Sequence, residues 1–140
     1  INETVNVDKP TGMVFDYLAD FTTSTQWDPG TVKTIRVEGN GGVGTRYENT
    51  SKFAGRVNTV IYVVQEVIPG KHIHLRGENS SLVANDRITV EPQGSGSTVT
   101  YRAEFDFQGI LKVLTPILSI LVKRLGKEGA LGMKQALDQL

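Results

Sequence analysis

Residues 109–125 read GILKVLTPILSILVKRL, and a more polar tail follows. At about 100° per residue, aliphatic side chains recur on one stripe, and lysines gather on the opposite side. Pro116 would break a backbone hydrogen bond inside a helix but suits its first turn, with Thr115 as the N-cap. We therefore predict a short helical turn at 109–114 and a long amphipathic helix from about 115.

The apolar stripe of this helix must be buried against another element. No other segment is helical at this length, so we expect the chain before it to be the partner of the helix. Gly129 and Gly132 lack side chains, so another segment can approach the helix closely there. The stripe residues that we expect to be buried are Leu114, Leu118, Leu121 and Leu125.

The chain before this helix is dominated by strand patterns. Val5 and Val7 alternate with polar residues, as in a first strand with one buried face. The tripeptide Asp-Lys-Pro at 8–10 suits a helix start, and two short helical segments are expected before Trp27. About six strands, separated by glycine-rich turns, then run to Phe107. The predicted fold class is α+β, with antiparallel strands, in one domain of residues 1–140.

Composition excludes several classes of function. Lys plus Arg and Asp plus Glu each total 15, so the formal net charge is zero, which argues against nucleic acid as a partner. The apolar run at 110–122 is shorter than the roughly 20 residues that span a bilayer, so we expect no stable membrane insertion. We see no secretory signal and expect a cytoplasmic protein, although a chain that begins at Ile1 leaves a removed leader open.

Turn and cap motifs along the whole chain carry a resemblance to a known family. They are VNVDKP at 5–10, VFDYLAD at 14–20, WDPG at 27–30, GVGT at 42–45, EP at 91–92, GSTVTY at 96–101 and FQG at 107–109. With these motifs the chain resembles the SRPBCC superfamily, whose fold is called START-like or helix-grip, and within it the polyketide cyclase/dehydrase-like group.

The resemblance implies a curved antiparallel sheet of about seven strands around the C-terminal helix, with a cavity between them. It also implies two short helices between the first and second strands. Members bind sterols, lipids, polyketides, plant hormones or other hydrophobic molecules, and some are aromatase/cyclases. Because the shared motifs are turns, caps and packing positions, they specify the fold rather than one of these functions.

The two histidines are the first candidates for chemistry. His72 and His74 share one strand face, a spacing that two metal ligands could use. Ile73 and Leu75 are expected on the inward face, however. Because successive side chains of a strand point to opposite faces, we expect both histidines to face solvent. The chain also has no cysteine. We therefore expect no metal and no cofactor.

Two carboxylates alternate with apolar residues, Glu3 and Asp86. A carboxylate that faces a cavity would be desolvated, which raises its pKa and suits it to proton transfer. The interpretation that we favour is structural: Glu3 frays at the terminus, and Asp86 pairs with an arginine such as Arg87 or Arg102.

Aromatic side chains give the stronger indication of a ligand site. Tyr47, Tyr101, Phe105 and Phe107 fall on predicted inward faces, and a tyrosine can orient a hydrophobic ligand that carries a few oxygens. Trp27 lies either at the cavity mouth or as a packing plug at that end. The residues that we predict to bind a ligand are Trp27, Tyr47, Asn49, Phe53, Asp86, Tyr101, Ala103, Phe105, Leu114 and Leu118.

The sequence therefore predicts binding of a small hydrophobic molecule, similar to a lipid, a polyketide or an aromatic compound. The cavity would lie between sheet and helix, with its mouth near Trp27 and the glycine-rich hairpin at 39–44. The alternative is an enzyme of the cyclase or dehydratase type, in which Tyr47, Tyr101 and Asp86 move protons. A second alternative is a non-catalytic protein-interaction module. The sequence is also compatible with a homodimer.

Overall fold

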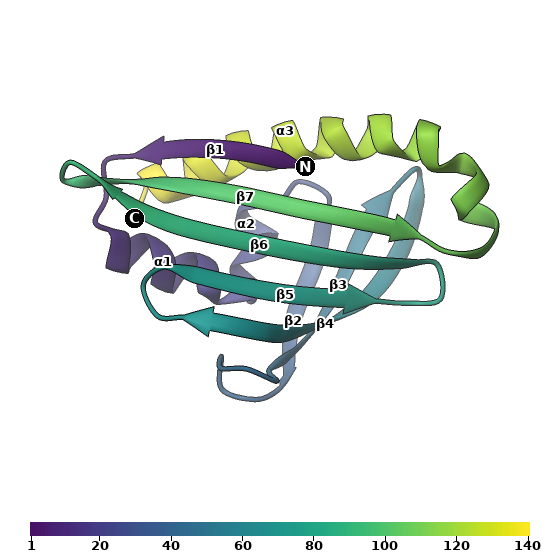
Figure 1. The fold of residues 1–140 in the computed structure, drawn as a ribbon, viewed down its shortest axis with the longest axis horizontal. Coiled ribbons are helices and arrows are strands. Elements are labelled where there is room, and N and C mark those ends of the chain that lie inside the picture. The colour runs from purple at the N-terminus through teal and green to yellow at the C-terminus, as the bar shows by residue number, and fades with distance from the viewer.

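The computed structural model describes residues 1–140 and has the helix-grip fold (Figure 1). Seven antiparallel strands form one sheet in the order β1-β7-β6-β5-β4-β3-β2. The long helix α3 lies alongside β1, and α1 lies at the opposite end of the molecule from η2. The elements are β1 Asn2–Val7, α1 Thr11–Ala19, η1 Phe21–Thr23, α2 Ser24–Trp27, β2 Thr31–Glu38, β3 Arg46–Phe53, β4 Arg56–Ile68, β5 His72–Glu78, β6 Leu82–Gln93, β7 Gly96–Phe107, η2 Gly109–Leu114 and α3 Thr115–Asp138.

The first and last strands pair with each other and bring the two ends of the chain together. Val5 of β1 is paired with Val99 of β7, and Val7 is paired with Ser97. All four side chains are buried, as the alternating patterns predict. Gly96 is required here because a Cβ at this position would lie 2.4 Å from the carbonyl oxygen of Val7.

The C-terminal helix confirms the predicted break at Pro116. The 3-10 helix η2 ends at Leu114, and α3 begins at Thr115 with the proline in its first turn. Thr115 is not the cap: it is the first helical residue, and its hydroxyl donates to the carbonyl of Lys112.

Burial along α3 follows the predicted stripe with one exception. Leu118 is buried, and Leu121 and Leu125 are partly buried. The prediction for Leu114 is wrong, because this residue is 44% exposed at the end of η2, before the chain turns along the sheet.

The close approach expected at the glycines of α3 occurs at Gly132. A Cβ there would lie 2.1 Å from the carbonyl oxygen of Trp27, so α2 contacts the helix backbone directly. Gly129 differs, since a Cβ at that position would have no heavy atom within 4 Å.

Strand β2 departs from the expected alternation. Thr34 is buried, whereas Ile35 and Val37 are exposed. The hydroxyl of Thr34 accepts a hydrogen bond from Asn49 and bonds Ser24, so the inward face of this edge strand is polar. The predicted helix start is also shifted: Pro10 occupies the N-cap position of α1, and no side chain caps the helix.

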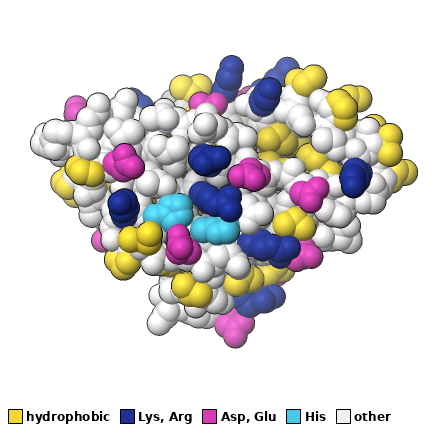
Figure 2. Space-filling view, viewed as in Figure 1, with side chains coloured by type: hydrophobic (Ala, Val, Ile, Leu, Met, Phe, Trp, Pro, Cys, Tyr) yellow, Lys and Arg dark blue, Asp and Glu magenta, His cyan; other side chains and the backbone are white.

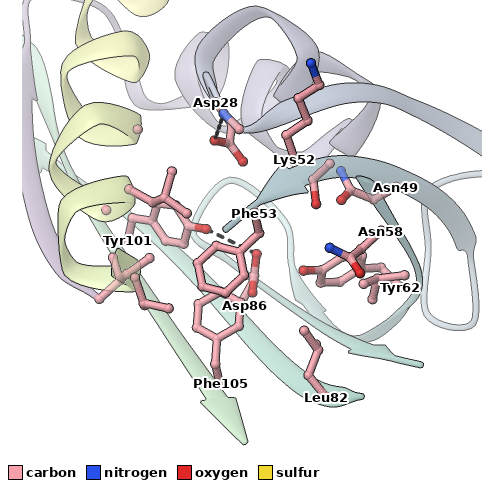
Figure 3. Close-up of a pocket in the computed structure, with 18 of the residues that line it drawn as sticks. Asp28, Asn49, Lys52, Phe53, Asn58, Tyr62, Leu82, Asp86, Tyr101 and Phe105 are labelled. Atoms are coloured by element: carbon pink, nitrogen blue, oxygen red, sulfur yellow. Dashed lines mark hydrogen bonds between the residues drawn. The ribbon is translucent and has the colours of Figure 1, made fainter. Parts of the chain in front are cut away.

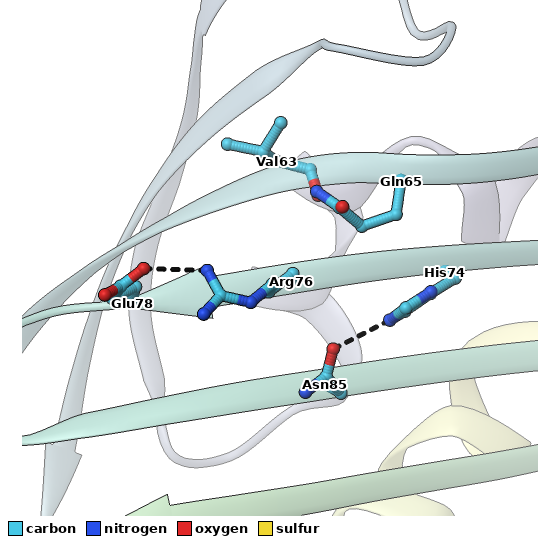
Figure 4. Close-up of polar contacts among 6 residues, drawn as sticks. All are labelled: Val63, Gln65, His74, Arg76, Glu78 and Asn85. Atoms are coloured by element: carbon cyan, nitrogen blue, oxygen red, sulfur yellow. Dashed lines mark hydrogen bonds and ion pairs between the residues drawn. The ribbon is translucent and has the colours of Figure 1, made fainter. Parts of the chain in front are cut away.

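Both histidines lie on the outer face of the sheet, opposite the buried Ile73 and Leu75. His74 Nε2 is 2.8 Å from Asn85 Oδ1, beside an ion pair of 2.7 Å between Arg76 and Glu78 (Figure 4). His72 Nδ1 is 2.8 Å from the hydroxyl of Thr89. The histidines thus belong to the polar network of the outer surface.

Candidate functional site

A cavity of about 100 Å³ lies between the concave face of the sheet and α3 (Figure 3). Twelve of its 21 lining residues are hydrophobic. Phe53 and Phe107 form part of the wall as stacked rings with centroids 6.2 Å apart. The helix contributes Leu125 and Gly129, and the missing side chain at Gly129 leaves space open.

Asp86 is the most unusual polar group of this cavity. The alternation of β6 places it between Ala84 and Ile88 on the buried face, where it is only 3% exposed. Its Oδ2 accepts a hydrogen bond of 3.2 Å from the hydroxyl of Tyr101, and its Oδ1 has no partner in the protein. The favoured pairing of Asp86 with Arg87 or Arg102 is therefore wrong.

Burial raises the pKa of Asp86 to about 7. The hydrogen bond from Tyr101 lowers this pKa, whereas the carboxylate of Asp28 raises it. Asp86 therefore changes its protonation state near neutral pH, as the sequence-based argument for a desolvated carboxylate anticipates. Its neighbouring carboxylate is Asp28, not Glu3.

Asp28 follows α2 in the turn WDPG. Its carboxylate accepts hydrogen bonds of 3.0 Å from the backbone N–H of Gly30 and from the hydroxyl of Thr31. Burial raises the pKa of Asp28, and these two hydrogen bonds lower it. The cavity thus holds two carboxyl groups with raised pKa values and no arginine.

Tyrosines provide the other polar groups. Tyr62 of β4 and Tyr101 of β7 line the cavity, and burial raises the pKa of both phenols well above the usual value. Both hydroxyls therefore stay protonated at neutral pH and can donate hydrogen bonds. Asn49 also lines the cavity, but its amide already donates to Thr34.

Trp27 lines the cavity and also plugs it at one end. The indole is 2% exposed and meets Tyr101 edge-to-face, with ring centroids 5.5 Å apart. Its Nε1 has no hydrogen-bond partner. Trp27 is therefore an interior residue and does not lie at a solvent-facing mouth.

The cavity opens at a different place from the one predicted. None of residues 39–44 lines it, because this loop folds back on β4: the N–H of Gly44 donates to the carbonyl of Val64, and the N–H of Val64 donates to the carbonyl of Thr45. The exposed lining residue is Lys52, beside the partly exposed Phe53 on β3 and Leu125 on α3. The opening thus lies between the end of β3 and the helix.

Six of the ten predicted ligand-binding residues line the cavity, and four do not. Tyr47 is buried against Phe21 with ring centroids 5.8 Å apart, Ala103 is buried in the core, Leu118 packs with Phe107, and Leu114 is exposed. The residues that line it are Trp27, Asn49, Phe53, Asp86, Tyr101 and Phe105. Contact with a ligand remains a prediction for all of them.

Sequence reasoning missed two residues that line the cavity. Asp28 adds a second carboxyl group, and Gly129 leaves space open. Asp28 is part of the WDPG motif, which reads as a turn, and nothing local indicates that its carboxylate is buried. Gly129 was noted only as a place of close approach, yet it borders empty space.

The family described as polyketide cyclase/dehydrase and lipid transport matches residues 1–138. The chain belongs to this family. No protein in the curated collection of sequences matches it.

Solved structures of other proteins share this fold. The Zhui aromatase/cyclase from Streptomyces sp. R1128 superposes with a TM-score of 0.85 at 15% identity, covering 99% of this chain and 93% of that one. A START superfamily protein from Mycobacterium smegmatis gives 0.83 at 15% identity, covering 99% and 97%. At these identities the likeness concerns the fold alone.

Proposed function

We propose that the cavity binds a small hydrophobic molecule that carries one or two oxygen atoms. The observation that supports this most directly is Oδ1 of Asp86, a buried carboxylate oxygen with no partner, in a cavity whose lining is mostly hydrophobic. Buried polar atoms are nearly always hydrogen-bonded, so an unpaired oxygen at a cavity wall is a natural contact for a ligand. Membership of a family named for cyclases, dehydrases and lipid transport is consistent with this proposal.

The protonation state of Asp86 determines which ligand oxygen it prefers. With a pKa of about 7, the neutral and ionised forms are both populated near neutral pH. The neutral acid donates to a carbonyl oxygen, and the carboxylate accepts from a hydroxyl. Tyr101 holds the other carboxylate oxygen, which fixes the orientation of Asp86 in either case.

The cavity volume limits the size of the enclosed part of the ligand. A cavity of about 150 Å³ lined by aliphatic and aromatic side chains holds one benzene molecule. The volume of about 100 Å³ is smaller, so it encloses part of one ring or a short branched chain, and the rest of a ligand would reach the opening. A longer molecule would extend outward between Lys52 and Leu125.

Matched small molecules test this function. Cyclohexanol and methylcyclohexane have similar shapes and differ in the hydroxyl, and isothermal titration calorimetry can measure the binding of each. We expect both to bind, with cyclohexanol favoured by about 0.5–1.5 kcal/mol through its hydrogen bond. In Asp86→Leu this preference should vanish while methylcyclohexane still binds. If neither molecule binds, the proposal is refuted.

A cyclase or dehydratase activity is the second candidate. The observation that favours it is the pair of carboxyl groups with raised pKa values, Asp28 and Asp86, together with two protonated tyrosines in one cavity. A carboxylate with a pKa near 7 can take a proton from carbon beside a ketone, and the enolate can then attack a second carbonyl that receives a proton from a phenol. Conversion of a linear polyketone by the protein, lost in Asp86→Asn with ligand binding retained, would support this activity.

A further inference from the structure

Exposed aliphatic side chains gather at one end of the molecule, around η2 and the first turns of α3. Ile110 and Val113 are 84% and 80% exposed. The space-filling view shows apolar side chains at this end, at the upper right (Figure 2). We call this surface the apolar end patch, and it consists of Ile110, Val113, Leu114, Ile117 and Ile120.

The position of this patch on α3 explains why the sheet cannot cover it. Leu118 and Val122 are buried against the sheet. Ile117 and Ile120 lie on the opposite side of the same helix, according to the helical repeat of 3.6 residues. The start of α3 is therefore apolar on both faces. Proteins that act alone in water rarely expose a contiguous surface of this kind, and such surfaces usually bind something.

The segment that carries the patch bears only positive charges. Residues 107–127 contain Lys112, Lys123, Arg124 and Lys127 but no aspartate or glutamate, although the whole chain has a net charge of zero. No carboxylate lies within ion-pair distance of these four cations. The segment thus carries both exposed aliphatic side chains and cations that form no ion pair.

A second cationic segment lies beside the first. Residues 49–65 carry Lys52 and Arg56 and no acid. Phe53, at the end of β3, packs against the cluster of Phe107, Leu118 and Val122, which places this hairpin next to the start of α3. Lys52 also lines the cavity, so positive charge extends from the start of α3 to the cavity opening.

We propose that η2 and the start of α3 dock reversibly on an anionic lipid surface. The apolar end patch would enter the boundary between headgroups and acyl chains, and the flanking lysines and arginines would lie among the anionic headgroups. This is an interfacial contact, since none of the helices combines the length and hydrophobicity that crossing a bilayer requires. The proposal is independent of the ligand proposed for the cavity.

Charge favours lipid over a second copy of the chain. In a two-fold dimer built on this patch, the same surface of both copies meets itself. Lys112 and Arg124 would then lie near the same cations of the partner, with no acid on the segment to compensate them. Such a like-charge contact is unfavourable, whereas an anionic membrane pairs with every one of these cations.

Vesicle sedimentation tests the proposal directly. We expect the protein to sediment with phosphatidylcholine vesicles that contain phosphatidylserine, and much less with phosphatidylcholine alone. The double variant Val113→Asn/Ile117→Asn should lose this binding. The control Val32→Asn/Val43→Asn replaces two exposed valines on β2 and the loop that follows it, and should bind as the parent does.

Neutralising cations tests the electrostatic part separately. Lys112→Gln/Arg124→Gln should weaken binding by about fivefold for each cation removed, whereas Lys33→Gln/Lys71→Gln should not. Patch variants that bind vesicles as well as the parent, or equal binding to neutral and anionic vesicles, would overturn the proposal. So would a dimer in analytical ultracentrifugation that the patch variants dissociate, because the patch would then bind a second copy.

Discussion

The hydroxyl of Tyr101 lies 3.2 Å from Oδ2 of Asp86, and this is the only hydrogen bond that the buried carboxylate receives from the protein. One neutral donor does not compensate for the loss of water around a charge. The folded protein therefore holds a proton on Asp86 up to a pH of about 7, which makes both stability and binding depend on pH.

Asp86→Asn should remove much of the pH dependence of stability. Because the pKa of Asp86 is about 7 in the folded protein and about 4 in the unfolded chain, its contribution is most favourable below about pH 4 and falls as the pH rises to about 7. The three-unit difference corresponds to about 4 kcal/mol. In urea denaturation at about pH 5 and about pH 8, the parent should lose more stability than the variant. Equal losses would mean that Asp86 is ionised in the folded state.

Tyr101→Phe should raise the pKa of Asp86 further, because the hydrogen bond from Tyr101 lowers it. Nuclear magnetic resonance of the labelled carboxyl carbon measures this shift. Tyr17→Phe is the matched control, since its hydroxyl bonds Gln26 on the surface, far from the cavity lining. An unchanged pKa in Tyr101→Phe would show that the hydrogen bond has little effect on the charge.

Two glycines of α3 should respond to the same substitution in opposite directions. Gly129→Ala should stabilise the protein by about 0.5–1 kcal/mol, because alanine favours the helix and its Cβ meets no atom. Gly132→Ala should destabilise it, since its Cβ would collide with the carbonyl of Trp27. Thermal denaturation measures both. Gly129→Leu should additionally fill the cavity and abolish methylcyclohexane binding, and undiminished binding would place the ligand elsewhere.

Ketone binding should weaken as the pH rises through about 7. Cyclohexanone can only accept a hydrogen bond, so it prefers the protonated form of Asp86. Cyclohexanol can donate or accept, and its affinity should change much less over the same range. Calorimetric titrations of both compounds across this range compare them directly. A parallel decrease for both would indicate a general loss of structure instead of a change at one carboxyl group.

Local sequence patterns predicted the fold well because periodicity and turn residues are local properties. The break at Pro116, the long helix after it and the alternation of β7 all follow from residues close together in the chain. The exposure of Leu114 could not be predicted in this way, because the pattern does not show where the helix leaves the sheet.

The site depends on residues that are distant in sequence. Asp28 and Asp86 are 58 positions apart, and only the folded chain brings both to one cavity. A carboxylate next to Arg87 in sequence suggested an ion pair, but neighbours on a strand point to opposite faces, and Arg87 pairs with Glu104 on the outside. The sequence pattern also did not reveal the inward face of β2, because its buried residue is Thr34, which is held by side-chain hydrogen bonds.

The contact of Gly132 with the backbone of Trp27 forms a tight clamp that fixes the C-terminal part of α3 against α2. Met133 and Leu137, both fully buried, strengthen that clamp. Leu118 lies 14 residues away, which is about 21 Å along the axis at 1.5 Å per residue. A tilt of about 5° at the clamp would therefore move the far end of the helix by roughly 2 Å. A tilt of this size would have to loosen the packing of Leu118 and Val122 against Phe107, and it would widen the cavity for larger molecules.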